Sequence, residues 1–302
     1  TAGGTIGAIA VELSSTTGDV IREFNIGGGG ADLTIGVPVT NGAASSAGIT
    51  KIGDGTLTLN AVNTYNGLTT VLGGTLEVTG SLANNTSADV LVASAGTTFD
   101  GTEPAIVRSV AGGAPFADLG SQIIGDRLFG TRADLLAGTN QGGDPLTVGM
   151  AWRMFADAEP QSTAPCLHAV SDVVQLTGIT ETSPFVLQMT YDANLVTPAT
   201  ERGLQLAWLD EAQWVNAVAG NSVIGDDAVA RYLGSWDAFT SDYGSDLNAL
   251  LGSWGVDKGS AAVWAVLNHS SEFGVLVPEP GTWLMLLAAA VAGLLLRRKG
   301  KR

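Results

Sequence analysis

The sequence predicts a mainly β protein with an N-terminal parallel β-helix (solenoid), a C-terminal β-sandwich-like domain and a single hydrophobic helix at the C-terminus. Three observations predict this architecture. Most of the 41 glycines precede residue 146, whereas all seven tryptophans follow it, so two different cores fill a chain with room for about two domains. Short segments of alternating apolar and polar residues recur throughout, which is typical of strands with one buried face. An apolar stretch and a basic cluster end the chain.

Residues 1–99 are predicted to form the solenoid. Period-two alternation is present in ADLTIGV (31–37), GTLTLN (55–60) and GTLEVTG (74–80), and glycine-rich turns separate these segments. The segments recur at intervals of roughly 15–25 residues, as in repeat architectures. No strand alone buries enough apolar surface, but stacked coils bury a continuous core. A plain antiparallel sheet is the alternative.

Residues 100–145 are interpreted as the last solenoid turn and a linker, with a short helix around 120–136. Residues 146–277 are rich in tryptophan and short alternating segments, which indicates a β-sandwich-like domain. The predicted strands are 146–154, 172–178, 185–192, 204–210, 213–218, 261–269 and 272–277, and one or two helical turns are expected within 245–257.

Residues 48–78 place turns and strands in a fixed order. They contain a Gly-x-Gly turn, a Leu-Thr-Leu strand, an Asn-x-Tyr-x-Gly turn, a Thr-Thr-Val strand and a Gly-Gly-Thr-Leu strand. This order resembles the autotransporter-associated β-strand repeat, and looser copies lie at 27–39 and 82–99. The resemblance implies an exported bacterial surface protein and a right-handed parallel β-helix. The residues that carry it are Gly53, Gly55, Leu57, Leu59, Asn63, Tyr65, Gly67, Thr69, Val71, Gly73, Gly74 and Leu76.

Residues 282–296 are predicted to form a transmembrane helix. The stretch is shorter than the ~20 residues that usually span a bilayer core of ~30 Å, but an interfacial tryptophan and snorkelling basic side chains can bridge the difference. The basic cluster stays cytoplasmic by the positive-inside rule. A buried C-terminal helix of a soluble domain is the alternative, which five charges at its end disfavour. The expected membrane residues are Trp283, Leu284, Leu287, Leu294 and Leu296, and the basic stop is Arg297, Arg298, Lys299, Lys301 and Arg302.

Pro278, Glu279 and Pro280 directly precede this helix, and the prolines favour an extended backbone that a protease can grip. The order of these features in residues 278–302 resembles the PEP-CTERM sorting signal. That resemblance implies processing by exosortase, a membrane cysteine protease-transpeptidase. It also implies transient inner-membrane anchoring, then transfer to the surface or matrix of a biofilm-forming, exopolysaccharide-producing Gram-negative-type bacterium. Residues 214–225 and 251–280 resemble the domain that precedes this tail in planctomycete-type surface proteins.

Few residues could carry catalysis. Cys166 is the only cysteine, which excludes an intrachain disulfide, and a Cys166–His168 pair would lie in a loop that gives it no fixed position. His269 could form a triad with Ser270 or Ser271 and with Glu272 or Asp257, but no GxSxG nucleophile elbow is present. Two histidines cannot make a three-histidine zinc site, and there is no HExxH motif.

Carboxylates offer no stronger signal. The adjacent pairs Asp210-Glu211 and Asp226-Asp227 would point to opposite faces of a strand, so neither predicts a catalytic pair. Calcium binding by Asp144, Asp226 and Asp227 stays open, although no EF-hand or nonapeptide calcium repeat is present. No cofactor is expected.

We therefore expect an exported structural protein of the cell surface or extracellular matrix, not an enzyme. The net charge of -15 argues against nucleic acid as a partner of the body. The partners expected are exosortase and the membrane, with exopolysaccharide as an open third. A glycan-binding or adhesion module is the alternative, which exposed Trp214, Trp236 or Trp254 would favour. A polysaccharide-active enzyme on a β-helix is a third reading, and it needs carboxylates that converge in one cleft.

Overall fold

The protein is described by a computed structural model. It describes residues 4–6, 10–27, 31–80, 82, 90–92, 105–116, 122–123, 131–153, 167–198, 200–211 and 213–278. The predicted membrane helix at 282–296, the basic stop and Cys166 lie outside these residues.

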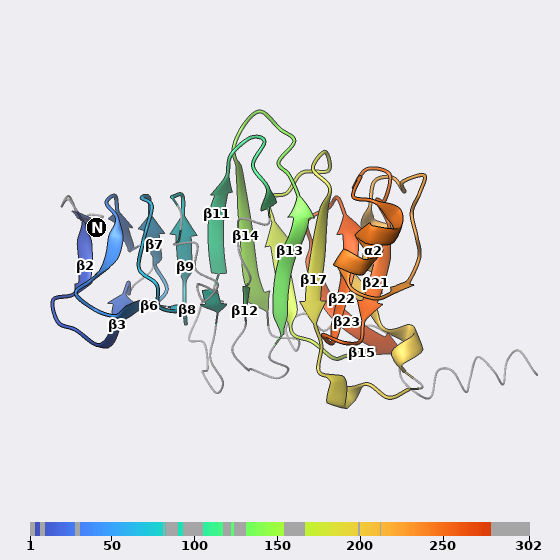
Figure 1. The fold of residues 1–302 in the computed structure, drawn as a ribbon, viewed down its shortest axis with the longest axis horizontal. Coiled ribbons are helices and arrows are strands. Elements are labelled where there is room, and N and C mark those ends of the chain that lie inside the picture. Colours follow the sequence, from blue (N-terminus) through green and yellow to red (C-terminus); the bar gives the residue numbers. More distant parts are fainter. Residues whose placement is uncertain are drawn as a thin grey trace, which may run out of the picture.

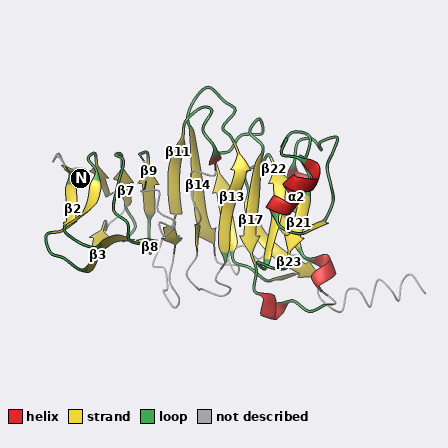
Figure 2. Ribbon diagram, viewed as in Figure 1, coloured by secondary structure: helices red, strands yellow, loops and turns green. Residues whose placement is uncertain are grey.

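Two long β-sheets run along the longest axis of the molecule, with their strands ranked roughly in chain order from β3 to β21 (Figures 1 and 2). The first sheet contains β1 (Gly4–Ile6), β4 (Asp32–Ile35), β7 (Thr56–Leu59), β9 (Thr75–Val78), β11 (Ala105–Val110), β14 (Leu146–Arg153), β16 (Val173–Thr177), β23 (Glu272–Pro278), β18 (Gln205–Asp210) and β19 (Gln213–Asn216), with β15 (Leu167–Ala169) beside β23. The second contains β20 (Tyr232–Leu233), β21 (Trp254–Asp257), β22 (Ala262–Leu267), β17 (Phe185–Thr190), β13 (Arg132–Gly138), β12 (Gln122–Ile123), β10 (Val90–Val92), β8 (Thr69–Val71), β6 (Ser46–Ile52) and β3 (Asp19–Asn25).

The N-terminal half is a parallel β-solenoid, as the sequence predicts. Strands β1, β4, β7, β9 and β11 pair in parallel in one sheet, and β3, β6, β8, β10 and β12 do so in the other. Strands β2 (Val11–Ser14) and β5 (Val39–Gly42) add a short parallel third sheet. The alternative of a plain antiparallel sheet is wrong for these residues.

Period-two alternation decides which side chains enter the solenoid core. In β7, Leu57 and Leu59 are 0% and 1% exposed, while Thr56 and Thr58 are partly exposed. Leu76 and Val78 repeat this pattern one turn later, and β9 pairs in register with β7. Identical positions of successive turns therefore stack into one continuous apolar core.

Both sheets continue into the C-terminal half, where the pairing becomes antiparallel. The change occurs between β11 and β14 in the first sheet and between β12 and β13 in the second. One core cluster contains Val174 and Phe273 from the first sheet together with Leu187 and Val263 from the second. Two antiparallel layers thus pack face to face on the same axis as the solenoid.

The two helix predictions for this part of the chain have different outcomes. Within the segment 120–136, residues 122–123 and 132–136 lie in strands β12 and β13, and residues 120–121 and 124–130 lie outside the described residues. Ala133 and Leu135 alternate into the core, and β13 pairs with β17. The segment 245–257 contains one helical turn, in which the Leu250 N–H donates to the Asp246 carbonyl at 3.0 Å, followed by β21. A longer helix, α2 (Trp236–Tyr243), lies before this segment. Helix α2 begins at Ser235, whose side chain accepts a hydrogen bond from the Ala238 N–H, and ends at Gly244 with φ 85°.

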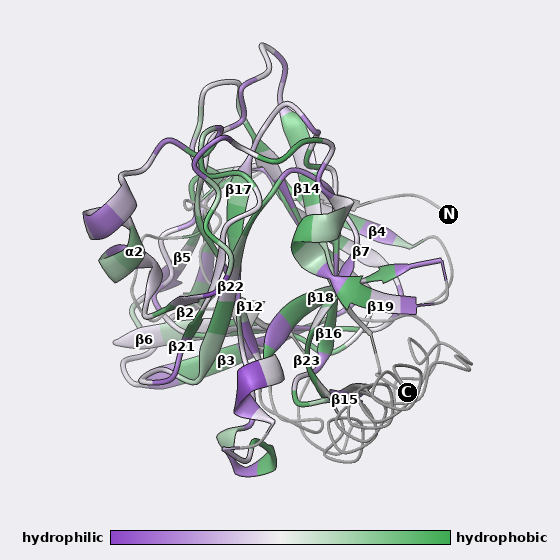
Figure 3. Ribbon diagram, turned by 90° about the vertical axis from the view of Figure 1, so that its right-hand side faces the viewer, coloured by the Kyte–Doolittle hydropathy of each residue, from purple (hydrophilic) through white to green (hydrophobic). Residues whose placement is uncertain are grey.

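Helix α2 covers the outer face of the second sheet and builds a second small core there (Figure 3). Trp236 and Phe239 pack on Trp264 with ring centroids 5.2 and 4.7 Å apart. The Trp264 ring is fully buried and its Nε1–H donates to the Gly234 carbonyl at 3.0 Å. Gly255 leaves room for this ring, since a Cβ there would lie 2.4 Å from its Cζ2.

Candidate functional sites: the repeat and the sorting segment

The Asn-x-Tyr-x-Gly turn of the repeat ties neighbouring solenoid turns together. Asn63 is fully buried; its Oδ1 accepts from the Val39 N–H at 3.0 Å and its Nδ2 donates to the Ala61 carbonyl at 2.8 Å. Tyr65 fills the core at 2% exposed, and burial raises its pKa to about 12. A Cβ on Gly67 would lie 2.5 Å from the Ala47 carbonyl carbon, so only glycine allows this approach. The signature residues therefore hold the structure of the coil.

Lys51 is a buried cation between two turns of the repeat. Its side chain is fully buried, and Nζ donates to the carbonyls of Ile52, Gly53 and Gly73 at 3.1, 2.6 and 2.9 Å. Burial lowers the pKa of Lys51 to about 8, and the charge of Asp54 opposes that shift. The contact to Gly73 spans one coil, so this ammonium group links the Gly-x-Gly turn to the Gly-Gly turn of the next coil.

The sorting segment leaves the body directly from a central strand. β23 runs between β16 and β18, and Phe273, Val275 and Leu276 are at most 1% exposed. Pro278 is the last residue of β23 and pairs with Leu167 of β15. Glu279, Pro280 and all later residues of the predicted signal lie outside the described residues. No residue of connecting chain separates the last strand from the motif.

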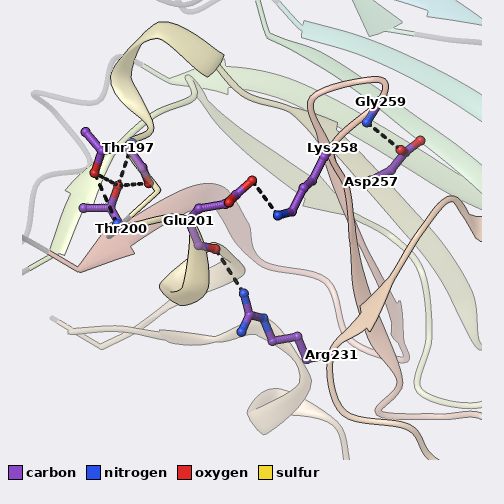
Figure 4. A network of polar contacts seen from close by, with 7 residues as sticks. All are labelled: Thr197, Thr200, Glu201, Arg231, Asp257, Lys258 and Gly259. Atoms are coloured by element: carbon purple, nitrogen blue, oxygen red, sulfur yellow. Dashed lines mark hydrogen bonds and ion pairs between the residues drawn. The ribbon is translucent and has the colours of Figure 1, made fainter.

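A polar network braces the segment beside β23 (Figure 4). The 3₁₀ helix η3 (Glu201–Gly203) lies against β23. Glu201 accepts from Lys258 in an ion pair of 2.8 Å, and its carbonyl accepts from Arg231 at 3.1 Å. Thr200, which precedes η3, exchanges hydrogen bonds with Thr197. The network connects η3 to the loop before β20 and to the β21–β22 turn.

His269 and Ser270, the disfavoured triad candidates, each contact other groups. His269 Nε2 lies 2.9 Å from the Ala217 carbonyl, and the ring packs edge-on against Trp208 with centroids 4.9 Å apart. Burial lowers the pKa of His269. The Ser270 hydroxyl donates to the Ile179 carbonyl at 3.0 Å, away from the imidazole. These contacts give both side chains structural roles at the end of β22.

The remaining candidates are also apart. Among the residues described, no three His, Cys, Asp or Glu side chains lie close enough to hold a metal ion together, so Asp144, Asp226 and Asp227 do not form a common cluster. His168 is exposed on β15. Trp214 and Trp236 are only 9% and 8% exposed, while Trp254 is partly exposed and packs against the main core; these contacts oppose the sugar-stacking role.

Family comparisons identify two short segments. Residues 49–78 match the passenger-associated-transport-repeat, and residues 276–299 match the PEP-CTERM protein-sorting motif. The chain carries a PEP-CTERM sorting motif. This motif implies an exported, surface-sorted protein that is processed by exosortase. No curated protein and no solved structure matches the chain.

Two features of the sorting end escaped sequence reasoning. The motif match begins at residue 276, within β23, so the body and the motif share residues. The pairing of β15 with β23 gave no usable signal, because β15 has only three residues. None of the helices that the structure describes is long and apolar enough to cross a membrane.

Proposed function

We propose that this chain is an exported structural protein of the cell surface or extracellular matrix. Its C-terminal helix at 282–296 anchors it transiently in the inner membrane, and exosortase then cleaves near Pro280 and passes the body outward. The body is a rigid rod that holds surface or matrix material in place and performs no catalysis.

The observation that carries this proposal is the continuous pair of sheets that ends in the sorting motif. Each solenoid turn pairs in register with the next, and both sheets extend into the antiparallel half. This arrangement suits a long, stiff element better than a cleft enzyme. Large side chains of the C-terminal half, including Trp264, are buried in its core. The buried Trp214 and Trp236 weigh against the alternative of a glycan-binding module.

The test is the intact mass of the protein in its native host. The full chain is expressed in the wild-type strain and in a strain without exosortase. The intact mass of the protein in each washed surface fraction is then measured by mass spectrometry. Loss of the residues after about 280 in the wild type alone supports sorting by cleavage. A full-length protein in the membrane fraction of both strains contradicts it and makes the tail a permanent anchor.

The structural role has its own measurement. A matrix protein stays with the washed surface material in amounts comparable to other matrix components, and its deletion alters the mechanical strength of that material. A processed protein that is recovered entirely in the culture medium, with an unchanged matrix, contradicts the structural role but leaves the sorting proposal standing.

A further inference from the structure

The sorting motif overlaps the folded body, which limits how it can be recognised. The match to the motif starts at Leu276, and β23 continues to Pro278. Leu276 and Val277 are 1% and 2% exposed. A protease that grips the chain around Glu279 as an extended peptide therefore meets residues that the sheet already holds.

The last residues of β23 have a strand partner on one side only, although η3 also lies against β23 and Val277 belongs to the main core. On one flank, β18 pairs with β23 no further than Leu276, which lies opposite Gln205. On the other flank, β15 pairs with Leu276, Val277 and Pro278. Within the described part of the chain, Val277 and Pro278 therefore have β15 as their single strand neighbour.

The register shows which bond holds this flank. The Val170 N–H donates to the Val275 carbonyl at 3.0 Å. Antiparallel pairs alternate between hydrogen-bonded and non-hydrogen-bonded positions, so His168 and Val277, two residues further on each strand, are the next hydrogen-bonded pair. Pro278 falls at a non-hydrogen-bonded position, where its missing N–H costs nothing.

Little chain connects this strand to the membrane. Five residue steps join Pro278 to Trp283, the first large apolar residue of the tail, and they span at most about 17 Å when fully extended. The interfacial layer of a bilayer takes about 6 Å of that length. Glu279 therefore lies, along the chain, between a strand that the sheet holds and the predicted membrane helix.

We propose that β15 is a strap whose release from β23 opens the sorting motif to the processing enzyme. This inference rests on the proposed function above. Release removes the strand partner of Val277 and Pro278, and detachment of these two residues lengthens the reach from Leu276 to Trp283 to about 24 Å, while the rest of β23 stays paired with β16 and β18. A three-residue strand with an exposed His168 is the kind of peripheral element that opens locally without global unfolding.

The first test compares two substitutions of the same exposed residue. His168→Pro removes the N–H that bonds to Val277, whereas His168→Val keeps that N–H and a side chain suited to strands. Cleavage is followed as the fraction of shortened protein over time after induction in the native host, with the exosortase-deficient strain as blank. We expect His168→Pro to be cleaved several-fold faster than the wild type and His168→Val to match the wild type. Equal or slower cleavage of His168→Pro, with hydrogen exchange showing β15 open and β17 still protected, overturns the proposal.

A second test locks the strap and does not depend on how well the proline variant folds. Ala169 and Leu276 form a non-hydrogen-bonded pair, whose short Cα separation suits a disulfide. The variant Ala169→Cys, Leu276→Cys and Cys166→Ser is isolated in membranes that contain exosortase. We expect no cleavage while the disulfide is intact and cleavage after a reductant is added. Cleavage of the oxidised protein overturns the strap. If the wild type itself is never cleaved by exosortase, the proposed function fails instead.

Discussion

Replacing Lys51 by methionine should destabilise the N-terminal half of the protein. Methionine keeps most of the apolar stem but removes three hydrogen bonds to backbone carbonyls at 2.6–3.1 Å. The Ile52 carbonyl keeps a second donor, the Ile26 N–H. The cost of the substitution therefore falls on the carbonyls of Gly53 and Gly73, which lose the donor that Lys51 provides. A buried acceptor without a partner costs about 1–3 kcal/mol, which gives a loss of about 2–6 kcal/mol in the free energy of unfolding.

The distribution of tryptophan supplies an internal control for the measurement. All seven tryptophans follow residue 145, so their fluorescence reports the C-terminal half, whereas far-UV circular dichroism reports both halves. Urea unfolding is followed with both probes for the wild type, Lys51→Met and Lys258→Met. Lys258 is an exposed partner in a surface ion pair, so its substitution should change stability by less than about 1 kcal/mol.

The outcome decides between two opposite effects at the same site. Burial of an ammonium group is costly, and replacing buried charges by apolar residues sometimes stabilises a protein. If Lys51→Met is as stable as the wild type or more so, the desolvation of Lys51 outweighs its three hydrogen bonds, and the reasoning above is refuted. If it is less stable by the expected amount, and hydrogen exchange localises the loss to β6 and β8, the cation holds the two turns together.

Three further predictions follow from the same contacts. Burial lowers the pKa of Lys51 to about 8, so the unfolded chain binds more protons than the folded chain between about pH 8 and pH 10.5. The free energy of unfolding of the wild type should therefore rise across this window, relative to that of Lys51→Met, by up to about 3 kcal/mol. Urea titrations at each pH measure this difference. Gly67→Ala should lower the melting temperature of the solenoid because its Cβ would meet the Ala47 carbonyl carbon, whereas Gly143→Ala, whose Cβ meets nothing within 4 Å, should leave it unchanged. Asn63→Ala should cost about 1–3 kcal/mol by leaving the Val39 N–H without its acceptor, and an unchanged urea midpoint would contradict that role.

The solenoid could be predicted because its physics is local. Leu57 and Leu59 alternate within a few residues, and Asn63 and Gly67 mark a turn that the sequence alone displays. The strand β13, which begins inside the segment 120–136 where a short helix is expected, shows the opposite case. Ala133 and Leu135 are good helix formers, but β13 pairs with β17, which lies about 50 residues further along the chain, and that ladder overrides local preference.

The contacts that side chains make at the candidate sites could not be predicted from the sequence either. The contact of Lys51 with the Gly73 carbonyl depends on how two coils stack, and no sequence pattern distinguishes this buried lysine from an exposed one. The sequence disfavours His269 as a triad member but does not show its contacts, which are with the ring of Trp208, 61 positions earlier in the chain, and with the backbone of Ala217. Only the three-dimensional neighbours separate a structural histidine from a functional one.

The change from parallel to antiparallel pairing explains how such a rod can end. A parallel solenoid leaves every sheet with an open edge at its last turn, and open edges invite pairing with other chains. Here the antiparallel strands β14 and β13 pair with the last parallel strands, β11 and β12, and carry both sheets onward, and the far edges end in the two-residue β20 and the short β19. The chain then returns through the middle of the first sheet in β23, so the strand that leads into the sorting motif is also one of the most buried. β23 pairs with β16 on one flank and with β18 on the other, so this strand joins the sorting motif to the centre of the sheet.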